Sequence, residues 1–107
     1  MGSISVACYK PKPGQEKALL DLVRNHLPPL RAEGLVTDRA SIVLRAGDGT
    51  LIEIFKWASQ EAIAGAHSNP VALDLWKRFE AACTYEIPAS LPEFQQMFAH
   101  FEPVLFE

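Results

Sequence analysis

Cysteine, basic residues and long hydrophobic runs are all scarce in this sequence, and each scarcity excludes a class of protein. The 107 residues include only two cysteines, Cys8 and Cys83, which form no C-x-x-C pair. Ten Lys and Arg residues face thirteen Asp and Glu residues, for a formal net charge of −3, and no basic cluster is present to bind the phosphates of a nucleic acid. No apolar run approaches the ~20 residues of a membrane-spanning helix. We therefore expect neither a nucleic-acid partner nor a membrane span.

The start of the chain also lacks the features of an export signal. Residues 1–6 contain no charged segment and no long apolar segment. We expect a cytoplasmic protein in which Cys8 and Cys83 are buried, reduced thiols, although two cysteines also permit a disulfide.

What the sequence does contain is enough apolar material for one core. Hydrophobic residues make up 49% of the chain, and its length matches one typical domain of ~100–150 residues. The sequence shows no internal repeat and no linker. We predict a single domain over residues 1–107.

The pattern of apolar residues predicts four strands, over residues 4–9, 39–46, 51–57 and 84–87. The prolines at 11 and 13 should end the first strand, because proline cannot donate to a central ladder. The Gly-Asp-Gly-Thr sequence at 47–50 predicts a hairpin that pairs the second and third strands in an antiparallel manner.

Residues 15–32 have apolar side chains at helical spacing, which predicts the first helix. Its apolar stripe comprises Ala18, Leu19, Leu22, Val23, His26, Leu27 and Leu30. Pro28 and Pro29 should kink this helix, or end and restart it, because proline lacks an N–H and clashes with the preceding turn. Gly34 should then end the helix in a left-handed conformation.

The second helix is expected to start at a Ser59 cap and to be divided in two. Asn69 followed by Pro70 predicts the new start. The inward stripe of the second piece is expected to comprise Leu73, Trp76, Phe79 and Cys83. A capping-box pattern at Ser90 predicts a short C-terminal helix through about residue 98, and the apolar tail at 101–107 should cover a sheet edge or reach a partner.

The resulting element order is βαββαβ with a C-terminal helix. This order predicts an α+β fold of the ferredoxin-like type, with both helices on one face of the sheet. The opposite face would be uncovered, and little of the chain is left to cover it. We therefore expect a homodimer in which two sheets face each other.

Four short motifs follow one another over most of residues 4–87. They are Lys12-Pro13-Gly14, the stretch from Leu30 to Leu35, Glu53-x-Phe55-x-Trp57-x-Ser59-x-Glu61-Ala62, and Ala66-His67-Ser68-Asn69-Pro70. In this order the chain resembles the antibiotic biosynthesis monooxygenase-like family of the dimeric α+β barrel superfamily. The resemblance implies a dimeric barrel and a range of activities: cofactor-free oxygenation of polyketide aromatics, quinol oxygenation and haem degradation. Many members have no known activity, and the fold does not settle the function.

His67 is the first candidate for a catalytic residue. It ends the first piece of the second helix, and many members of the resembled family have a histidine at this Ala-His position. An imidazole titrates near neutral pH and can act as the general base that prepares a substrate for reaction with O₂. The alternative is that the ring hydrogen-bonds the interrupted helix backbone.

His26 lies at the edge of the apolar stripe of the first helix. It either faces a pocket between helix and sheet, where it would contact a substrate, or is a half-buried structural histidine. His100 fits no pattern, and the histidines and cysteines lack the spacing of metal ligands. We expect no metal and no cofactor.

Aromatic residues are the candidates for binding a flat substrate. Trp57 and Trp76 would form the walls of such a pocket, with Tyr9, Phe55, Phe79 and Tyr85 adding to them. The alternative is that these side chains form only the core or the dimer interface.

Two further residue patterns leave alternatives open. Glu53 interrupts an apolar strand, so it either forms a cross-strand ion pair with Arg45 or Lys56 or places a carboxylate in a pocket. The haem-degrading branch implies a helical His, a Trp and an Asn on the first strand. The strand at 4–9 has no Asn, so Ser5 or Cys8 would have to replace it.

The sequence lacks the nucleophile, zinc-protease, Walker and dinucleotide-binding motifs. The leading interpretation is a cofactor-independent monooxygenase acting on a small aromatic or polyketide-like compound. The alternatives are a non-catalytic small-molecule-binding or stress-related dimer and, further off, haem binding or degradation.

Overall fold

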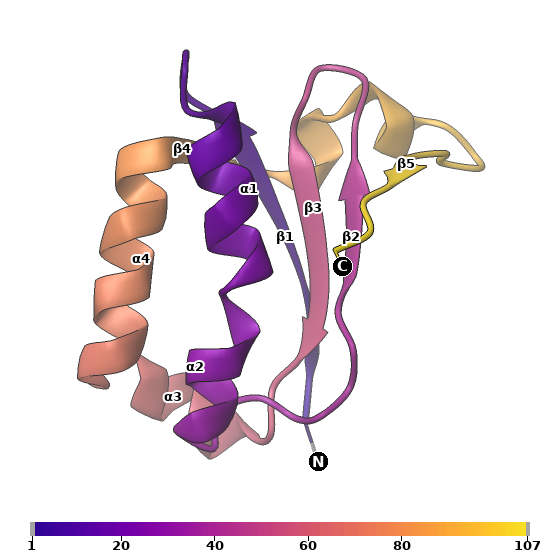
Figure 1. The fold of residues 1–107 in the computed structure, drawn as a ribbon. Coiled ribbons are helices and arrows are strands. Elements are labelled where there is room, and N and C mark those ends of the chain that lie inside the picture. The colour runs from indigo at the N-terminus through magenta and orange to yellow at the C-terminus, as the bar shows by residue number, and fades with distance from the viewer. Residues whose placement is uncertain (1, 107) are drawn as a thin grey trace.

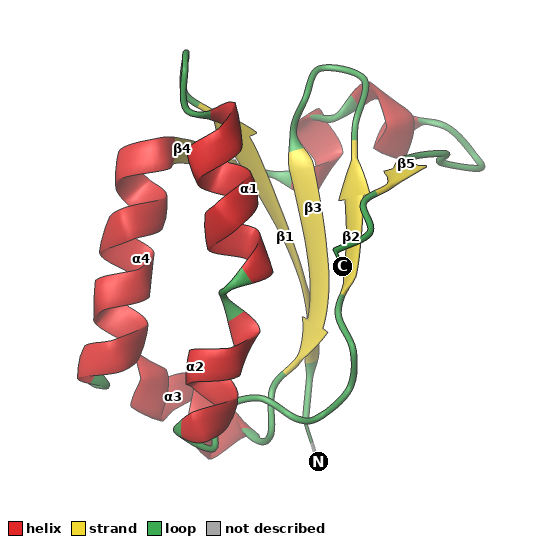
Figure 2. Cartoon of the chain, in the orientation of Figure 1, coloured by secondary structure: helices red, strands yellow, loops and turns green. Residues whose placement is uncertain are grey.

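The computed structural model describes residues 2–106 and shows one antiparallel sheet with the strand order β4-β1-β3-β2-β5 (Figure 1). The strands are β1 (Ile4–Pro11), β2 (Ile42–Arg45), β3 (Leu51–Lys56), β4 (Cys83–Glu86) and β5 (Glu102–Pro103). The helices are α1 (Glu16–Arg24), α2 (Leu27–Ala32), α3 (Gln60–Ala66) and α4 (Pro70–Ala82). The α+β class is confirmed (Figure 2).

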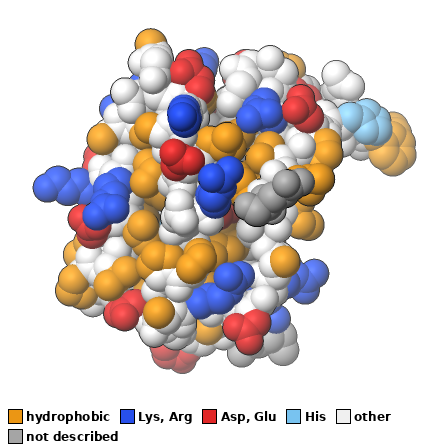
Figure 3. Space-filling model, viewed as in Figure 1, with side chains coloured by type: hydrophobic (Ala, Val, Ile, Leu, Met, Phe, Trp, Pro, Cys, Tyr) orange, Lys and Arg blue, Asp and Glu red, His pale blue; other side chains and the backbone are white. Residues whose placement is uncertain are grey.

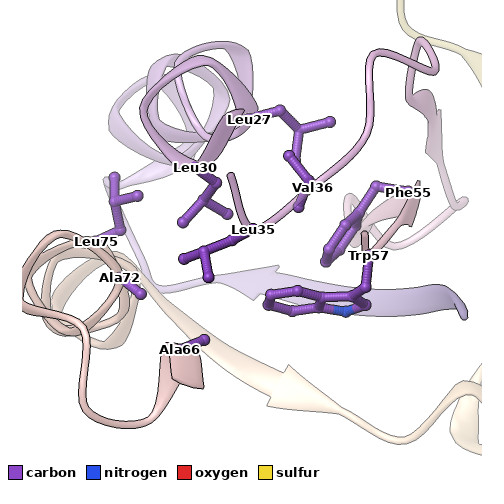
Figure 4. Packing of buried hydrophobic residues seen from close by; sticks show 9 residues of the cluster. All are labelled: Leu27, Leu30, Leu35, Val36, Phe55, Trp57, Ala66, Ala72 and Leu75. Atoms are coloured by element: carbon purple, nitrogen blue, oxygen red, sulfur yellow. The ribbon is translucent and has the colours of Figure 1, made fainter. Parts of the chain in front are cut away.

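The helices cover one face of the sheet (Figure 1). Successive side chains of a strand point to opposite faces, so alternate residues of each strand face the helices. On the central strand β3, Leu51 packs in a cluster with side chains of α1 and α4. Phe55 of β3 and Trp57, just after the strand, pack in a second cluster with α2, α3 and α4 (Figure 4). Ile52 and Ile54 belong to a third cluster. The sheet therefore has a helix-covered face and an outer face.

The two cysteines lie on opposite faces of this sheet. Cys83 belongs to the cluster formed with α1 and α4, whereas Cys8 packs with Ile52 on the outer face. Both are buried free thiols. Their burial is as predicted, and the sheet between them separates the two sulfur atoms.

β1 extends two residues further than expected and includes Pro11. Its last pair with β3 is Tyr9–Leu51, whereas Pro11 pairs with Cys83 of the edge strand β4. Pro11 thus has a strand neighbour on one side only, so its missing N–H is tolerated there. The hairpin at 47–50 and the antiparallel pairing of β2 with β3 are confirmed.

The first helix ends and restarts before its two prolines. α1 ends at Arg24 and α2 begins at Leu27, since Pro28 and Pro29 have no N–H for the carbonyls one turn earlier. Of the predicted stripe, Ala18 is exposed and Leu22 is only half-buried, whereas its other members are buried.

The end of α2 is the left-handed stop that the sequence predicts. Gly34 has φ +72°. Its N–H donates to the Arg31 carbonyl, and the Leu35 N–H donates to the Leu30 carbonyl, both at 2.9 Å. This pair of bonds is a Schellman motif, which satisfies carbonyls that the helix leaves unpaired.

Both caps of the divided second helix are confirmed, but its inward stripe is partly wrong. Ser59 Oγ accepts from the Ala62 N–H at 3.0 Å, and Asn69 Oδ1 accepts from the Val71 N–H at 2.9 Å. Leu73 is 46% exposed, because it is rotated by about 120° from Phe79 around the helix axis. The fully buried side of α4 comprises Ala72, Leu75, Phe79 and Ala82.

The expected C-terminal helix is replaced by two 3₁₀ turns, Pro88–Ser90 and Pro92–Gln95. Ser90 forms no capping box, because its Oγ donates to the Ile87 carbonyl at 2.7 Å. Glu93 Oε2 instead accepts from the Gly47 N–H at 2.8 Å. The turn is thereby attached to the β2–β3 hairpin.

The tail covers the free edge of β2, which is one of the two positions expected for it. β5 pairs with β2, and the Val104 N–H donates to the Val43 carbonyl at 2.8 Å. The Arg24 guanidinium lies 5.2 Å from the centre of the Phe106 ring, a cation–π distance. The last residues that the structure describes thus connect β2 to α1.

No described helix combines the length and the apolarity needed to cross a bilayer. The face of the molecule seen in Figure 3 mixes hydrophobic atoms with charged side chains of both signs.

Candidate functional site

A pocket of about 500 Å³ lies between the helices and the sheet, within the range of small-molecule sites. Its lining comprises Ser5, Val6, Ala7, Tyr9, His26, Phe55, Trp57, His67, Trp76, Phe79 and Tyr85. The candidate catalytic histidines and the aromatic residues named from the sequence therefore meet in one place. Their roles stay predictions.

The walls of this pocket are flat and apolar. Phe55 and Trp57 lie with their rings 5.5 Å apart, and Trp57 Nε1–H donates to Ser5 Oγ at 2.9 Å. The rings of Tyr9 and Tyr85 meet edge to face at 5.8 Å. No Lys, Arg, Asp or Glu is part of the lining. Such a surface suits an uncharged aromatic ligand.

The break between α1 and α2 directs His26 at the sheet. His26 is only 3% exposed, and its ring packs edge-on against Phe79 at 4.9 Å and Phe55 at 5.6 Å. Its Nδ1 lies 2.8 Å from Oε1 of Glu53, which is fully buried on β3. His26 thus lines the pocket and also has the one partnered nitrogen of a structural histidine, so both alternatives stay open.

Glu53 forms neither of the cross-strand ion pairs expected for it. Its Oε1 accepts from the Tyr9 hydroxyl at 2.8 Å as well as from His26, whereas Arg45 pairs with Glu102. Glu53 and Tyr9 both point to the helix-covered face, and α1 supplies no basic partner there. The ion-pair expectation is wrong because the side chain points inward.

The Tyr9 hydroxyl acts in this group only as a hydrogen-bond donor. Burial, followed by the charge of Glu53, raises the pKa of Tyr9 well above its ordinary value. Tyr9 therefore keeps its proton, and its O–H donates a hydrogen bond to Glu53. With Nδ1–H also donating, a neutral His26 ring carries its lone pair on Nε2.

Two atoms of this group have no hydrogen-bond partner among the described residues. They are Nε2 of His26 and Oε2 of Glu53, and both are buried. A buried polar atom without a partner costs about 1–3 kcal/mol, and such atoms in a native protein call for an explanation. A ligand or an ordered water in the pocket could form the missing hydrogen bonds to these two atoms.

His67 lies at the exposed rim of the pocket. Its ring packs against Trp76 at 5.2 Å. The helix break beside it is closed by backbone bonds, from the Ser68 N–H to the Gly65 carbonyl and from the Asn69 N–H to the Ala66 carbonyl. The hydrogen bonds of the described residues include none from the His67 ring, so the structural alternative for this residue has no support here.

The substitutes that haem degradation would need are divided between the two faces. Ser5 lines the pocket and bonds Trp57, but Cys8 packs on the outer face. Within residues 2–106, no three His, Cys, Asp or Glu side chains are grouped to hold a metal ion.

Sequence reasoning missed the contact between His26 and Glu53. Each residue interrupts an apolar pattern, His26 in a helical stripe and Glu53 in a strand. Two polar residues on faces that pack together are a signal for a buried pair, since buried polar groups seek partners.

No protein-family model matches the chain, and no curated protein matches it.

Proposed function

We propose that the protein is a cofactor-independent monooxygenase acting on a small aromatic or polyketide-like compound. The observation that carries the proposal is the aromatic pocket in which an imidazole with an unpartnered nitrogen lies against apolar walls. Pocket shape favours a flat ring system, and an imidazole supplies the base that such a reaction needs.

The reaction begins with loss of a proton from the substrate. The resulting electron-rich anion reduces O₂ and binds one of its oxygen atoms. For a ring CH₂ group the balance is CH₂ + O₂ → C=O + H₂O, so the substrate supplies all four electrons. The base is His67 at the rim or His26 at the floor of the pocket.

The test is oxygen uptake with anthrone, an uncharged tricyclic compound with one acidic CH₂ group. We expect one O₂ consumed for each anthraquinone formed, faster than in protein-free buffer. Binding of anthrone without oxygen uptake would overturn the proposal and favour the alternative, a non-catalytic small-molecule-binding dimer.

We also propose that the βαββαβ order and the strand order β4-β1-β3-β2 constitute the ferredoxin-like arrangement, and that the protein is a homodimer closed by its outer sheet face. On that face Val6, Ile54 and Ile42 form a cross-strand row. Val6 is 45% and Ile42 is 54% exposed. A cytoplasmic location is part of the proposal, since both cysteines are free thiols, as is usual in a reducing compartment.

A further inference from the structure

We propose that His26, held by Glu53 and Tyr9, is the proton acceptor of the pocket, and that the ligand is an uncharged aromatic molecule with a weakly acidic O–H or C–H group. The inference rests on the proposed function in that it identifies the base of that reaction. It concerns proton transfer to the pocket, which can be measured without oxygen.

The geometry of His26 is that of an oriented base. The break between α1 and α2 brings the ring to the sheet, and Glu53 fixes the ring through Nδ1–H at 2.8 Å. The remaining nitrogen, Nε2, is buried without a partner, and the residue lines the pocket. A carboxylate behind one imidazole nitrogen sets the tautomer and stabilises the imidazolium that forms when the other nitrogen takes a proton.

Proton transfer from a neutral ligand balances charge within this site. A proton moves from the ligand O–H or C–H to Nε2, the bonding pair stays on the ligand, and His26 becomes an imidazolium between Glu53 and the ligand anion. Glu53 then faces a cation at hydrogen-bond distance, an arrangement that offsets the cost of burying a charge. Glu53 and Tyr9 are positioning residues, since neither has to touch the ligand.

The rest of the pocket opposes the formation of an anion. Burial, with smaller effects of Cys83 and Glu80, raises the pKa of the pocket-lining Tyr85 to about 12. The lining contains no Lys or Arg, so a carboxylate or phosphate ligand would lose its hydration without gaining a cation. The titratable groups around the site are Tyr9, His26, Glu53, His67 and Tyr85. His26 alone has both a carboxylate partner and an unpartnered nitrogen among these.

His67 lacks the support that His26 has. Its ring is exposed and rests on Trp76, and the described residues give it no carboxylate partner. Water can therefore hydrate it in either protonation state, which leaves it a weaker candidate for a proton acceptor that works in a dry site.

The test uses 4-nitrophenol, whose absorption spectrum distinguishes the phenol from the phenolate. We expect the acid dissociation constant of bound 4-nitrophenol to be at least ten times larger in the wild-type protein than in His26→Gln. His67→Gln removes the other candidate base of the pocket, and it should change that constant much less than His26→Gln does. Equal constants in wild type and His26→Gln, or loss of the effect in His67→Gln, would overturn the proposal.

Two further measurements guard against a misfolded variant. Glu53→Gln keeps the shape of the side chain and the Tyr9 contact but removes the charge, so it should reduce the acidifying effect while the ligand still binds. In the wild-type protein, ¹⁵N NMR should show His26 as the Nδ1–H tautomer that becomes imidazolium when 4-nitrophenol binds. An unchanged His26 spectrum with the ligand bound would contradict the proposal directly.

These results separate this inference from the proposed function. If His26 takes a proton from 4-nitrophenol but no oxygen is consumed in the presence of anthrone, the oxygenase proposal is wrong and His26 remains the proton acceptor. Oxygen uptake that persists in His26→Gln would support the oxygenase proposal and would show that His26 is not its base. Binding of 4-nitrobenzoate as tight as that of 4-nitrophenol would contradict the expected preference for uncharged ligands.

Discussion

Cys83 shows how burial of one thiol makes the stability of the fold depend on pH. Burial, opposed in part by Lys12, raises the pKa of Cys83 from its ordinary 9.0 to about 11. The folded state thus holds this proton more tightly than the unfolded chain does. The stabilisation is fully present below about pH 9 and is lost as the pH rises through about 11.

We therefore expect the wild-type protein to lose about 2 kcal/mol more stability than Cys83→Ala between about pH 8 and about pH 11. Comparing the two proteins at each pH removes the common contribution of the tyrosines. The measurement is urea unfolding of both at the two pH values. Parallel losses would show that the Cys83 proton does not contribute.

Gly34 and Gly65 provide a second comparison at the scale of single residues. Neither glycine has a heavy atom within 4 Å of the place where a Cβ would lie, so only backbone conformation separates them. Gly34 has φ +72° and ends α2, whereas Gly65 lies within α3. We expect Gly34→Ala to destabilise the protein by about 1 kcal/mol and Gly65→Ala to stabilise it by about 0.5–1 kcal/mol. Thermal unfolding of both variants checks this, and equal signs would refute it.

The signals that could be predicted from sequence are those that act within a few residues. Ser59 and Asn69 cap their helices through bonds to N–H groups two or three residues away. The prolines break the first helix and Gly34 ends it for equally local reasons. Glu53 and His26 are 27 residues apart, so their contact depends on how the break between α1 and α2 is placed and rotated over β3. Spacing alone does not give that rotation.

At the scale of an element, the N-terminus of α4 depends on one side chain. Asn69 Oδ1 accepts from the N–H groups of Val71 and Ala72, and its Nδ2 donates to Glu33 Oε1 at 3.1 Å. We expect Asn69→Ala to cost about 1 kcal/mol of stability. Asn69→Ser keeps an oxygen acceptor, adds no charge beside Glu33 and loses only the exposed bond to Glu33, so its cost should be less than half as large. Chemical unfolding compares the three proteins, and an equal loss in both variants would place the effect in the Glu33 contact instead.

The C-terminal segment shows where a local signal can mislead. The Ser-x-x-Glu pattern at Ser90 predicts a capping box, but Glu93 binds the Gly47 N–H instead. Pro88 and Pro92 each open a 3₁₀ turn. A glutamate can satisfy a distant backbone N–H as well as a nearby one, and the hairpin supplies that distant partner. The tertiary contact with the hairpin therefore decides which N–H Glu93 binds.

At the scale of the whole molecule, the two faces of the sheet are unequal. Four helices cover one face, whereas the outer face is covered only in part. Leu91 and Phe101 pack over Cys8 and Ile52, but the neighbouring row from Val6 to Ile42 stays open. Apolar side chains that adjoin one another on an exposed sheet face mark an interaction site. A second copy brings an identical row, so the patch can bury itself by two-fold symmetry.

Ile42→Lys tests the proposed dimer, with Leu73→Lys as its control. Ile42 on the outer face is 54% exposed and Leu73 on α4 is 46% exposed, so the two changes place a charge at similarly accessible apolar positions. Burying an isoleucine contributes roughly 1.5–3 kcal/mol, and a two-fold interface contains two copies. Because Ile42 is only 54% exposed in the monomer, each copy can lose about half of that value. The total loss should be roughly 1.5–3 kcal/mol, a weakening of the dimer by about 10- to 100-fold.

Native mass spectrometry reads the outcome directly. We expect wild type and Leu73→Lys at twice the 11.8 kDa monomer mass and Ile42→Lys at the monomer mass, with circular dichroism showing all three folded. A monomeric wild type would remove the dimer altogether. A dimeric Ile42→Lys would move the interface away from the outer face, which would leave the open row on β1, β3 and β2 without a function in assembly.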